Sequence, residues 1–201
     1  MNSSDVNILI HAGDLTNIGE EKDIQSFLHW FQNIQGFEAK IFIDGNHEDH
    51  DFLQKNLNFR VNNVEYVKRG DTRNIFGYKV LFMGGADSID KENRTCYVDW
   101  FPQETISFKD MDNFVNNSNG VDIVVSHTAP MEFIENHIKI FSGSNDSSIK
   151  SLSSLVEHVT PKQWVFGHFH ENFSGIYCNG SNNDVEYTCL DCIWHDSSYE
   201  H

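Results

Sequence analysis

Histidine, aspartate and asparagine side chains gather in four short motifs. In chain order these are Gly13-Asp14, Gly45-Asn46-His47, Ser126-His127 and Gly167-His168-Phe169-His170. Carboxylate and amide oxygens with imidazole nitrogens, and no thiolate, form a donor set that suits a divalent first-row metal. Two such ions ~3.5–4 Å apart can hold a phosphate and lower the pKa of a bridging water. Asp14 is the natural candidate for a bridging carboxylate. The residue types therefore favour a site for divalent metal ions and a phosphate.

Each motif directly follows a segment with the pattern of a buried strand. Residues 6–12, 40–44, 121–125 and 163–166 are short and apolar, with frequent β-branched side chains. Apolar residues at helical spacing in residues 20–34 predict a helix between the first two strands, and residues 148–158 predict one before the last. The carboxyl ends of strands in α/β sheets are where ligand sites assemble. We therefore expect the four motifs to converge.

The middle and the end of the chain predict further elements. Residues 51–57 fit a short helix, residues 64–67 and 74–83 fit antiparallel or mixed strands, and residues 102–115 fit a helix. Residues 174–194 alternate in a way that favours a closing hairpin around Asn179-Gly180.

Composition bounds the class of protein. The chain has 201 residues, which suits a single domain over residues 1–201 with a sizeable core. The formal net charge is −16 and no Lys/Arg-rich run occurs, which disfavours stable binding of duplex nucleic acid through surface charge. The first residues lack the pattern of a signal peptide, and no apolar run approaches the ~20 residues of a membrane span. Four cysteines do not suggest a disulfide scaffold, so a cytoplasmic location without a membrane is expected.

In this order, the four motifs resemble the signature of the calcineurin-like metallophosphoesterase superfamily, with Glu48 extending the second motif. Residues 83–90, Arg94, residues 99–107 and residues 121–130 resemble a bacterial and phage-type subgroup. The resemblance covers nearly the whole chain. It implies an α/β fold, an αββα sandwich with two mixed β-sheets, here expected without the family's first strand.

The resemblance also implies a ligand set. Asp14 would bridge two ions, the second ion would be completed by Asn46, His127 and His168, and His170 would ligate the first ion. Manganese, iron, zinc and nickel all suit these donors.

Catalytic and substrate-binding roles follow from the same resemblance. Asp14 and His47 would be catalytic, and Asn46, His47 and Arg94 would contact the substrate. His47 would stay off the metals and protonate the leaving group, as suits an imidazole near neutral pH. The implied reaction is hydrolysis of a phosphomonoester or phosphodiester, including nucleotides, by metal-activated hydroxide.

One family motif is missing from the sequence. The family opens with a strand that carries Asp-x-His, whose two side chains ligate the first ion, whereas only Met-Asn-Ser-Ser precedes Asp5. The chain as given is therefore expected to keep Asp14 and His170 at the first ion and to hold one ion tightly. Two interpretations of this start are open: an internal Met of a longer product, which is favoured because every later motif is intact, or a natural truncation. A catalytically impaired scaffold with the same fold is the alternative function.

Several polar residues allow two interpretations. His11 is a candidate substitute ligand, although a buried, hydrogen-bonded strand histidine is favoured. Asp44 and Glu48 fit either acceptors that orient His47 or solvated loop residues, with solvation favoured. Arg94 fits a phosphate clamp and a surface ion pair equally well.

Two further groups have a polar or metal-binding alternative. Residues 49–51 could reach a substrate, and a solvated surface is expected for them. Cys189-x-x-Cys192 has zinc-knuckle spacing, but residues i and i+3 of a strand face opposite sides and no matching second pair occurs. A structural role is therefore expected for these cysteines.

Overall fold

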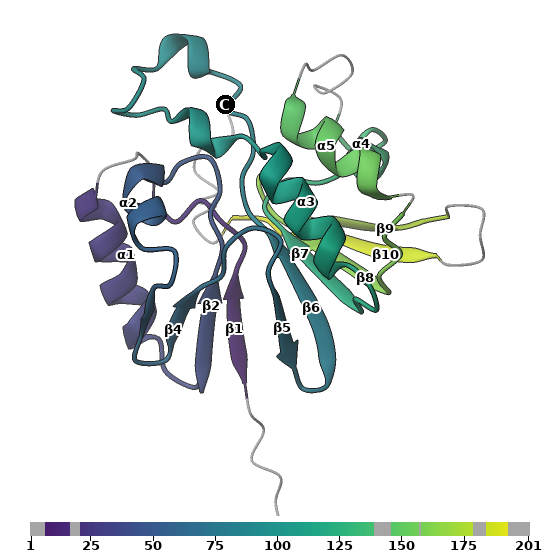
Figure 1. Ribbon diagram of the computed structural model, residues 1–201, viewed down its shortest axis with the longest axis horizontal. Helices are drawn as coiled ribbons and strands as arrows, with labels where there is room; N and C mark the ends of the chain where they lie inside the picture. Colours follow the sequence, from purple (N-terminus) through teal and green to yellow (C-terminus); the bar gives the residue numbers. More distant parts are fainter. Residues whose placement is uncertain (1–6, 17–20, 139–145, 157, 179–183, 193–201) are drawn as a thin grey trace, which may run out of the picture.

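The computed structural model describes residues 7–16, 21–138, 146–156, 158–178 and 184–192. Two mixed β-sheets pack face to face, with helices on the outer face of each, so the predicted αββα sandwich is confirmed (Figure 1). In the described part of the chain, no helix is long and apolar enough to span a membrane.

The first sheet has the strand order β1-β2-β4-β3. β1, β2 and β4 are parallel, and β3 pairs antiparallel with β4. The bounds are β1 Ile8–His11, β2 Ala39–Phe42, β3 Arg60–Val61 and β4 Val64–Tyr66. β1 and β2 confirm the first two predicted strands, and their carboxyl ends carry the Asp14 and Asn46 motifs.

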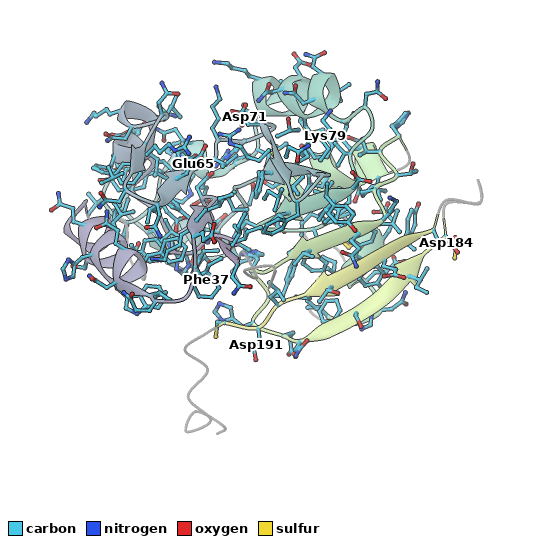
Figure 2. All side chains as sticks on the ribbon, turned by 90° about the horizontal axis from the view of Figure 1, so that it is seen from below. Phe37, Glu65, Asp71, Lys79, Asp184 and Asp191 are labelled. Carbon is cyan, nitrogen blue, oxygen red and sulfur yellow. The ribbon has the colours of Figure 1, made fainter. Side chains whose placement is uncertain are left out.

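The second sheet has the strand order β5-β6-β7-β8-β10-β9. Its four central strands are parallel, and the two outer strands are antiparallel to their neighbours. The bounds are β5 Thr72–Ile75, β6 Tyr78–Met83, β7 Ile123–Ser126, β8 Gln163–Phe166, β9 Phe173–Tyr177 and β10 Val185–Cys189. The pairing of β9 with β10 confirms the closing hairpin, whose predicted turn at Asn179-Gly180 lies outside the described residues. In Figure 2, Asp184 and Asp191 mark the two ends of β10.

Helices cover both outer faces of the sandwich. α1 (Glu21–Asn33) and α2 (His50–Lys55) lie over the first sheet, and α3 (Phe108–Asn117), α4 (Met131–Ile134) and α5 (Ser147–Val156) lie over the second (Figure 1). Two short 3-10 helices, η1 (Lys91–Asn93) and η2 (Pro102–Glu104), belong to the long connection between β6 and α3.

Three apolar clusters separate these layers. Ile41, Val80, Phe82 and Val125 pack between the two sheets, whereas the neighbouring Leu81 faces the helices over the second sheet. Central strands therefore bury both faces, which explains why their sequences are continuous apolar runs rather than alternating ones. This packing fixes the strand ends that carry the four motifs.

The helix predicted over residues 102–115 is wrong as a single element. The chain forms η2, passes through an extended Thr105 and restarts as α3. Ser107 and Asp110 form a reciprocal capping box at the start of α3, so the new helix begins there. The short elements α4 and β3 were not predicted, because four and two residues carry too little periodicity.

Candidate metal centre

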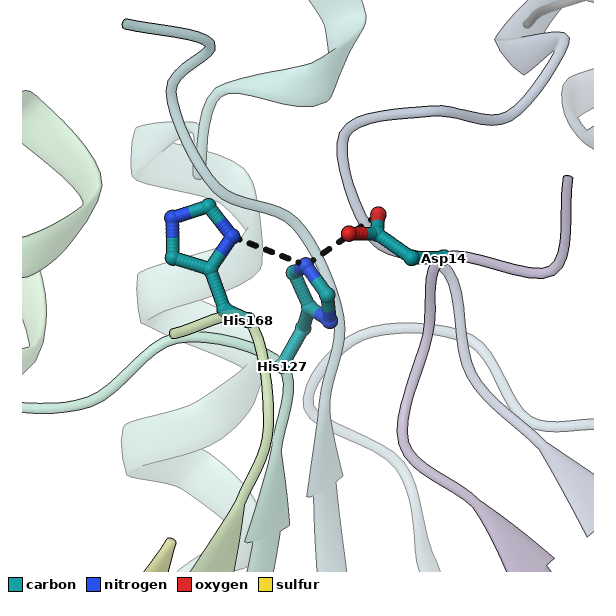
Figure 3. Close-up of side chains that lie close together, drawn as sticks. All are labelled: Asp14, His127 and His168. Carbon is teal, nitrogen blue, oxygen red and sulfur yellow. Dashed lines mark hydrogen bonds and ion pairs between the residues drawn. The ribbon is translucent and has the colours of Figure 1, made fainter. Parts of the chain in front are cut away.

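Three of the predicted ligands converge at the carboxyl ends of β1, β7 and β8. Ligand atoms of Asp14, His127 and His168 all lie within 4.8 Å of one another. The Nε2 atom of His127 lies 3.2 Å from Asp14 Oδ1 and 3.2 Å from His168 Nδ1 (Figure 3). Atoms bound to one ion at ~2.0–2.2 Å stand roughly 3.0–3.5 Å apart, so this spacing fits a shared divalent ion.

Asn46 supplies a fourth donor to the same point. Its Oδ1 lies 3.3 Å from His127 Nε2. His127 Nε2 lies at the centre of this group and can carry one proton, yet Asp14, Asn46 and His168 all present acceptors to it. A cation satisfies such a cluster of acceptors better than one proton does. The donor set therefore fits a divalent ion held by the residues that the sequence predicted for the second site.

A hydrogen bond at the other ring nitrogen, Nδ1, fixes the tautomer of His127. Its Nδ1 lies 2.7 Å from the carbonyl oxygen of Ala12, and because a carbonyl only accepts, Nδ1 must donate. The lone pair of the neutral ring therefore belongs to Nε2 and faces the cluster. A ligating histidine usually has such a carbonyl partner on its other nitrogen.

Unusual backbone conformations coincide with the candidate ligands. Asp14, His168 and His170 have positive φ angles of 53°, 70° and 52°, a region that non-glycine residues seldom adopt. Strain of this kind concentrates at functional sites. Gly45 allows the loops to approach closely, since a Cβ there would stand 2.2 Å from Asp14 Oδ1.

Charge within the cluster is shared between Asp14 and His127. Burial disfavours the charged ring of His127, but the Asp14 carboxylate outweighs that penalty and raises the pKa of His127 to about 9. Burial, with the charge on His127, lowers the pKa of His168 to about 3. Without metal at pH 7, His127 is therefore the charged imidazole. Its Nε2 proton lies at the point where the candidate metal-ligand atoms converge.

Glu48 holds two of the motif loops together. It is fully buried, and its carboxylate accepts hydrogen bonds from the backbone N–H groups of Leu15 and Gly45. Burial raises the pKa of Glu48 to about 8, with the Asp14 carboxylate adding to the shift. The expectation of a solvated Glu48 is wrong. The sequence shows Glu48 beside His47 but gives no sign that it reaches the Asp14 loop.

Asp44 is also buried, which contradicts the expectation of a solvated loop. Its carboxylate accepts from the Tyr66 hydroxyl at 2.9 Å and from Arg69 Nε at 2.8 Å. His50, expected at a solvated surface, is 3% exposed and faces Asp44 at 3.8 Å. This network anchors residues 44–50 to Tyr66 and Arg69.

His47 and Arg94 lie side by side. Arg94 Nη2 is 3.5 Å from His47 Nε2, while Arg94 Nε pairs with Asp90 at 2.8 Å. The ion pair expected as one interpretation of Arg94 is therefore present, and the guanidinium also lies next to His47, whereas the phosphate clamp stays a prediction. Burial lowers the pKa of His47, with the Asp14 carboxylate opposing the shift and Arg94 reinforcing it.

His170 and the alternative ligands stand apart from the cluster. His170 is exposed and lines a cavity of about 570 Å³ together with Asp14 and His168. His11 packs edge-on against Phe27 and Phe31, and its Nδ1 has no hydrogen-bond partner in the described part of the chain. In the described residues, no group that could hold a metal includes a cysteine.

A profile of the calcineurin-like phosphoesterases matches residues 1–172 of the chain. The chain belongs to the calcineurin-like phosphoesterase family. Metallophosphoesterase domain-containing protein 1 of Homo sapiens is 24% identical over 193 residues, covering 89% of the chain and 58% of that protein, and the Mus musculus protein gives the same figures. The chain thus spans less than two thirds of these relatives.

A solved structure shows the same fold. Phosphopantetheinyl hydrolase from Mycobacterium tuberculosis superposes with a TM-score of 0.52 at 13% identity, over 92% of the chain and 79% of that protein. At this identity the likeness concerns the fold alone. Membership of the calcineurin-like phosphoesterase family confirms the resemblance that the four motifs predicted. The bacterial and phage-type subgroup stays a prediction.

Proposed function

We propose that the protein hydrolyses a phosphate ester, either a monoester or a diester such as a nucleotide, with the help of a divalent metal. The observation that carries this proposal is the convergence of Asp14, Asn46 and His168 on His127 Nε2 at 3.2–3.3 Å. Manganese, iron, zinc and nickel suit these donors. A bound divalent ion would act as a Lewis acid that lowers the pKa of a water and neutralises phosphate charge.

The four converging residues would hold that ion, and Asp14 would also face a first ion shared with His170. Asp14 belongs to the cluster and lines the same cavity as His170. Burial alone would raise the pKa of Asp14, but the charge and the hydrogen bond of His127 outweigh burial and lower it, so the carboxylate stays ionised and is available to a cation.

His47 and Arg94 would receive the phosphate. Arg94 offers a guanidinium beside His47, and Asp90 at 2.8 Å holds that guanidinium in place. A phosphate between them would favour the protonated form of His47, offsetting the low pKa that burial gives the free ring. His47 could then donate its proton to the leaving oxygen.

Turnover of chromogenic phosphate esters tests the proposal. The purified chain is assayed with bis(p-nitrophenyl) phosphate and p-nitrophenyl phosphate, with and without added Mn²⁺, beside the variant His127→Ala. Metal-dependent release of p-nitrophenol that His127→Ala abolishes supports the hydrolase. Tight Mn²⁺ binding without turnover of either ester would instead favour the scaffold alternative.

A further inference from the structure

Asn46 differs from the other candidate ligands because its side chain has two unlike ends. The oxygen of a carboxamide can bind a metal, whereas the NH₂ group carries two protons and cannot. A rotation of 180° about the last side-chain bond exchanges these ends with little change in shape. Metal binding through Asn46 therefore requires something that fixes the orientation of the amide.

A chain of hydrogen bonds leads away from the NH₂ end of Asn46. Asn46 Nδ2 donates to Ser88 Oγ at 3.0 Å, and Ser88 Oγ donates to Glu104 Oε2 at 2.8 Å. Glu104 Oε1 accepts from the backbone N–H of Ser88 at 2.6 Å and from Trp100 Nε1 at 2.9 Å. The chain of hydrogen bonds that starts at Asn46 thus ends on the carboxylate of Glu104.

The direction of this chain follows from the chemistry of its members. A backbone N–H and an indole N–H can only donate, so Glu104 Oε1 must accept. Burial raises the pKa of Glu104, but the hydrogen bonds from Ser88 and Trp100 oppose this shift and favour the carboxylate. In its ionised form Glu104 also accepts at Oε2, which commits the hydroxyl proton of Ser88 to Glu104. The remaining lone pairs of Ser88 Oγ can then only accept, so Asn46 must present its NH₂ to Ser88. Its oxygen is left facing His127 Nε2 at 3.3 Å.

Burial protects the chain from competing water. Asn46, Ser88 and Glu104 are 5%, 3% and 0% exposed. The backbone that carries Ser88 can pack against the Asn46 loop because residue 84 is glycine, where a Cβ would stand 2.1 Å from Asp44 Oδ1. In such surroundings a donor that faces a donor is left without an acceptor, so the wrong amide orientation is strongly disfavoured.

We propose that Ser88 and Glu104 are positioning residues that lock the Asn46 amide with its oxygen toward the metal centre. The effect on metal affinity rests on the proposed metal-dependent function, whereas the locked orientation of the amide exists in the metal-free protein. Substitution of a residue that hydrogen-bonds to a metal ligand typically lowers metal affinity ~10–100-fold.

Two variants separate orientation from packing. Ser88→Ala removes the acceptor for Asn46. Glu104→Gln keeps the shape but reverses the chain, because its NH₂ would donate to Ser88 Oγ and commit the Ser88 hydroxyl to the Asn46 oxygen. Both variants should weaken Mn²⁺ binding ~10–100-fold by isothermal titration calorimetry. Ser154→Ala, which removes an exposed hydroxyl bonded within α5, is the matched control and should bind Mn²⁺ like the parent.

A double-mutant cycle with Asn46→Asp supplies the decisive comparison. A carboxylate presents an oxygen at either end and needs no orientation, so Ser88→Ala and Glu104→Gln should cost less than about threefold in that background. An equal loss of affinity in both backgrounds would overturn the positioning role, because it would show that the two residues act only through packing.

Nuclear magnetic resonance of the metal-free protein tests the lock independently of metal. The side-chain NH₂ signal of Asn46, assigned by its loss in Asn46→Asp, should shift clearly in Ser88→Ala and not in Ser154→Ala. An unchanged signal would overturn the inference. If the parent bound no Mn²⁺ while this signal shifted, the proposed function would fail and the lock would stand.

Discussion

The loop of residues 44–50 and the loop of residues 167–170 both carry candidate ligands, but they are held in different ways. In the first, Asp44, Asn46 and Glu48 are buried and each bonds to another segment. In the second, the backbone N–H of Gly167 donates to the His127 carbonyl at 3.0 Å, and the side chain of His170 is exposed. The first loop is therefore organised before any ligand binds, whereas His170 can still move.

This difference matches the different roles of the two loops in the proposed mechanism. A preorganised loop suits His47 and Asn46, since a proton donor and an oriented amide both require fixed positions. An exposed imidazole on a strained backbone suits a ligand that is recruited by the ion. The contrast leads to four predictions, the largest effect first.

The largest effect is expected at His47. His47→Ala should keep its Mn²⁺ content and lose ~10²–10⁴-fold in turnover of esters with poor leaving groups, because the leaving oxygen loses the imidazole proposed to protonate it. Metal analysis paired with rates on alkyl and nitrophenyl esters measures both. The loss should be smaller for nitrophenyl esters, which need no acid. Loss of metal from His47→Ala would mean that His47 is a ligand.

The second effect concerns pH and the proton on His127. Its pKa of about 9 in the metal-free protein means that Mn²⁺ must displace a proton below that pH. Apparent Mn²⁺ affinity should therefore rise ~10-fold per pH unit between pH 7 and 9 and then level off. Titrations in buffers of different ionisation enthalpy should show one proton released per ion at pH 7. A flat affinity over this range would contradict the Asp14–His127 ion pair.

The same pKa has the opposite consequence for the metal-free fold. A pKa raised above the ordinary value of 6.5 stabilises the folded state at low pH, and this contribution is lost as the pH rises through about 9. Metal-free protein should therefore become less stable over the range in which metal binding becomes tighter.

A third and smaller effect is expected at Glu48. Glu48→Gln places an NH₂ group against the backbone N–H of either Leu15 or Gly45, which should cost ~1–3 kcal/mol of unfolding free energy at pH values above about 8, where the Glu48 carboxylate is ionised. Mn²⁺ affinity should fall as well, since the Asp14 loop loses its tie to residues 44–50. Urea denaturation of the variant and of the exposed control Glu38→Gln measures the difference. Equal stability of the two variants would show that Glu48 does not hold the loops.

The sequence predicted the strand ends well and their cross-links poorly. Four motifs at strand ends were enough to place Asp14, Asn46, His127 and His168 at one point, because parallel strands align their carboxyl ends. Glu48 and Asp44 were expected at a solvated surface, since a charged residue in a polar loop is normally exposed. Their partners Leu15, Tyr66 and Arg69 lie 22–33 residues away, and no periodicity reports such contacts.

The positions of Ser88 and Glu104 behind Asn46 are also not predictable from the sequence. Both lie in the stretch that predicted the subgroup resemblance, yet the sequence gives no sign that they meet Asn46. A separation of 42 residues lies between Asn46 and Ser88, and the meeting depends on the order of strands in two different sheets. Side-chain networks that link sheets are a property of the tertiary fold.

The smallest effect on the first equivalent of metal is expected at His170. Because His170 lies outside the cluster around His127 Nε2, His170→Ala should bind its first Mn²⁺ within about threefold of the parent. The 201-residue chain should hold close to one tight equivalent after dialysis, since Asp14 and His170 alone would leave a first ion mostly to water. Turnover at saturating Mn²⁺ should still fall in His170→Ala if a weakly held ion contributes. Two tight equivalents in the parent, with one lost in His170→Ala, would show that the exposed loop closes on the first ion and completes its site.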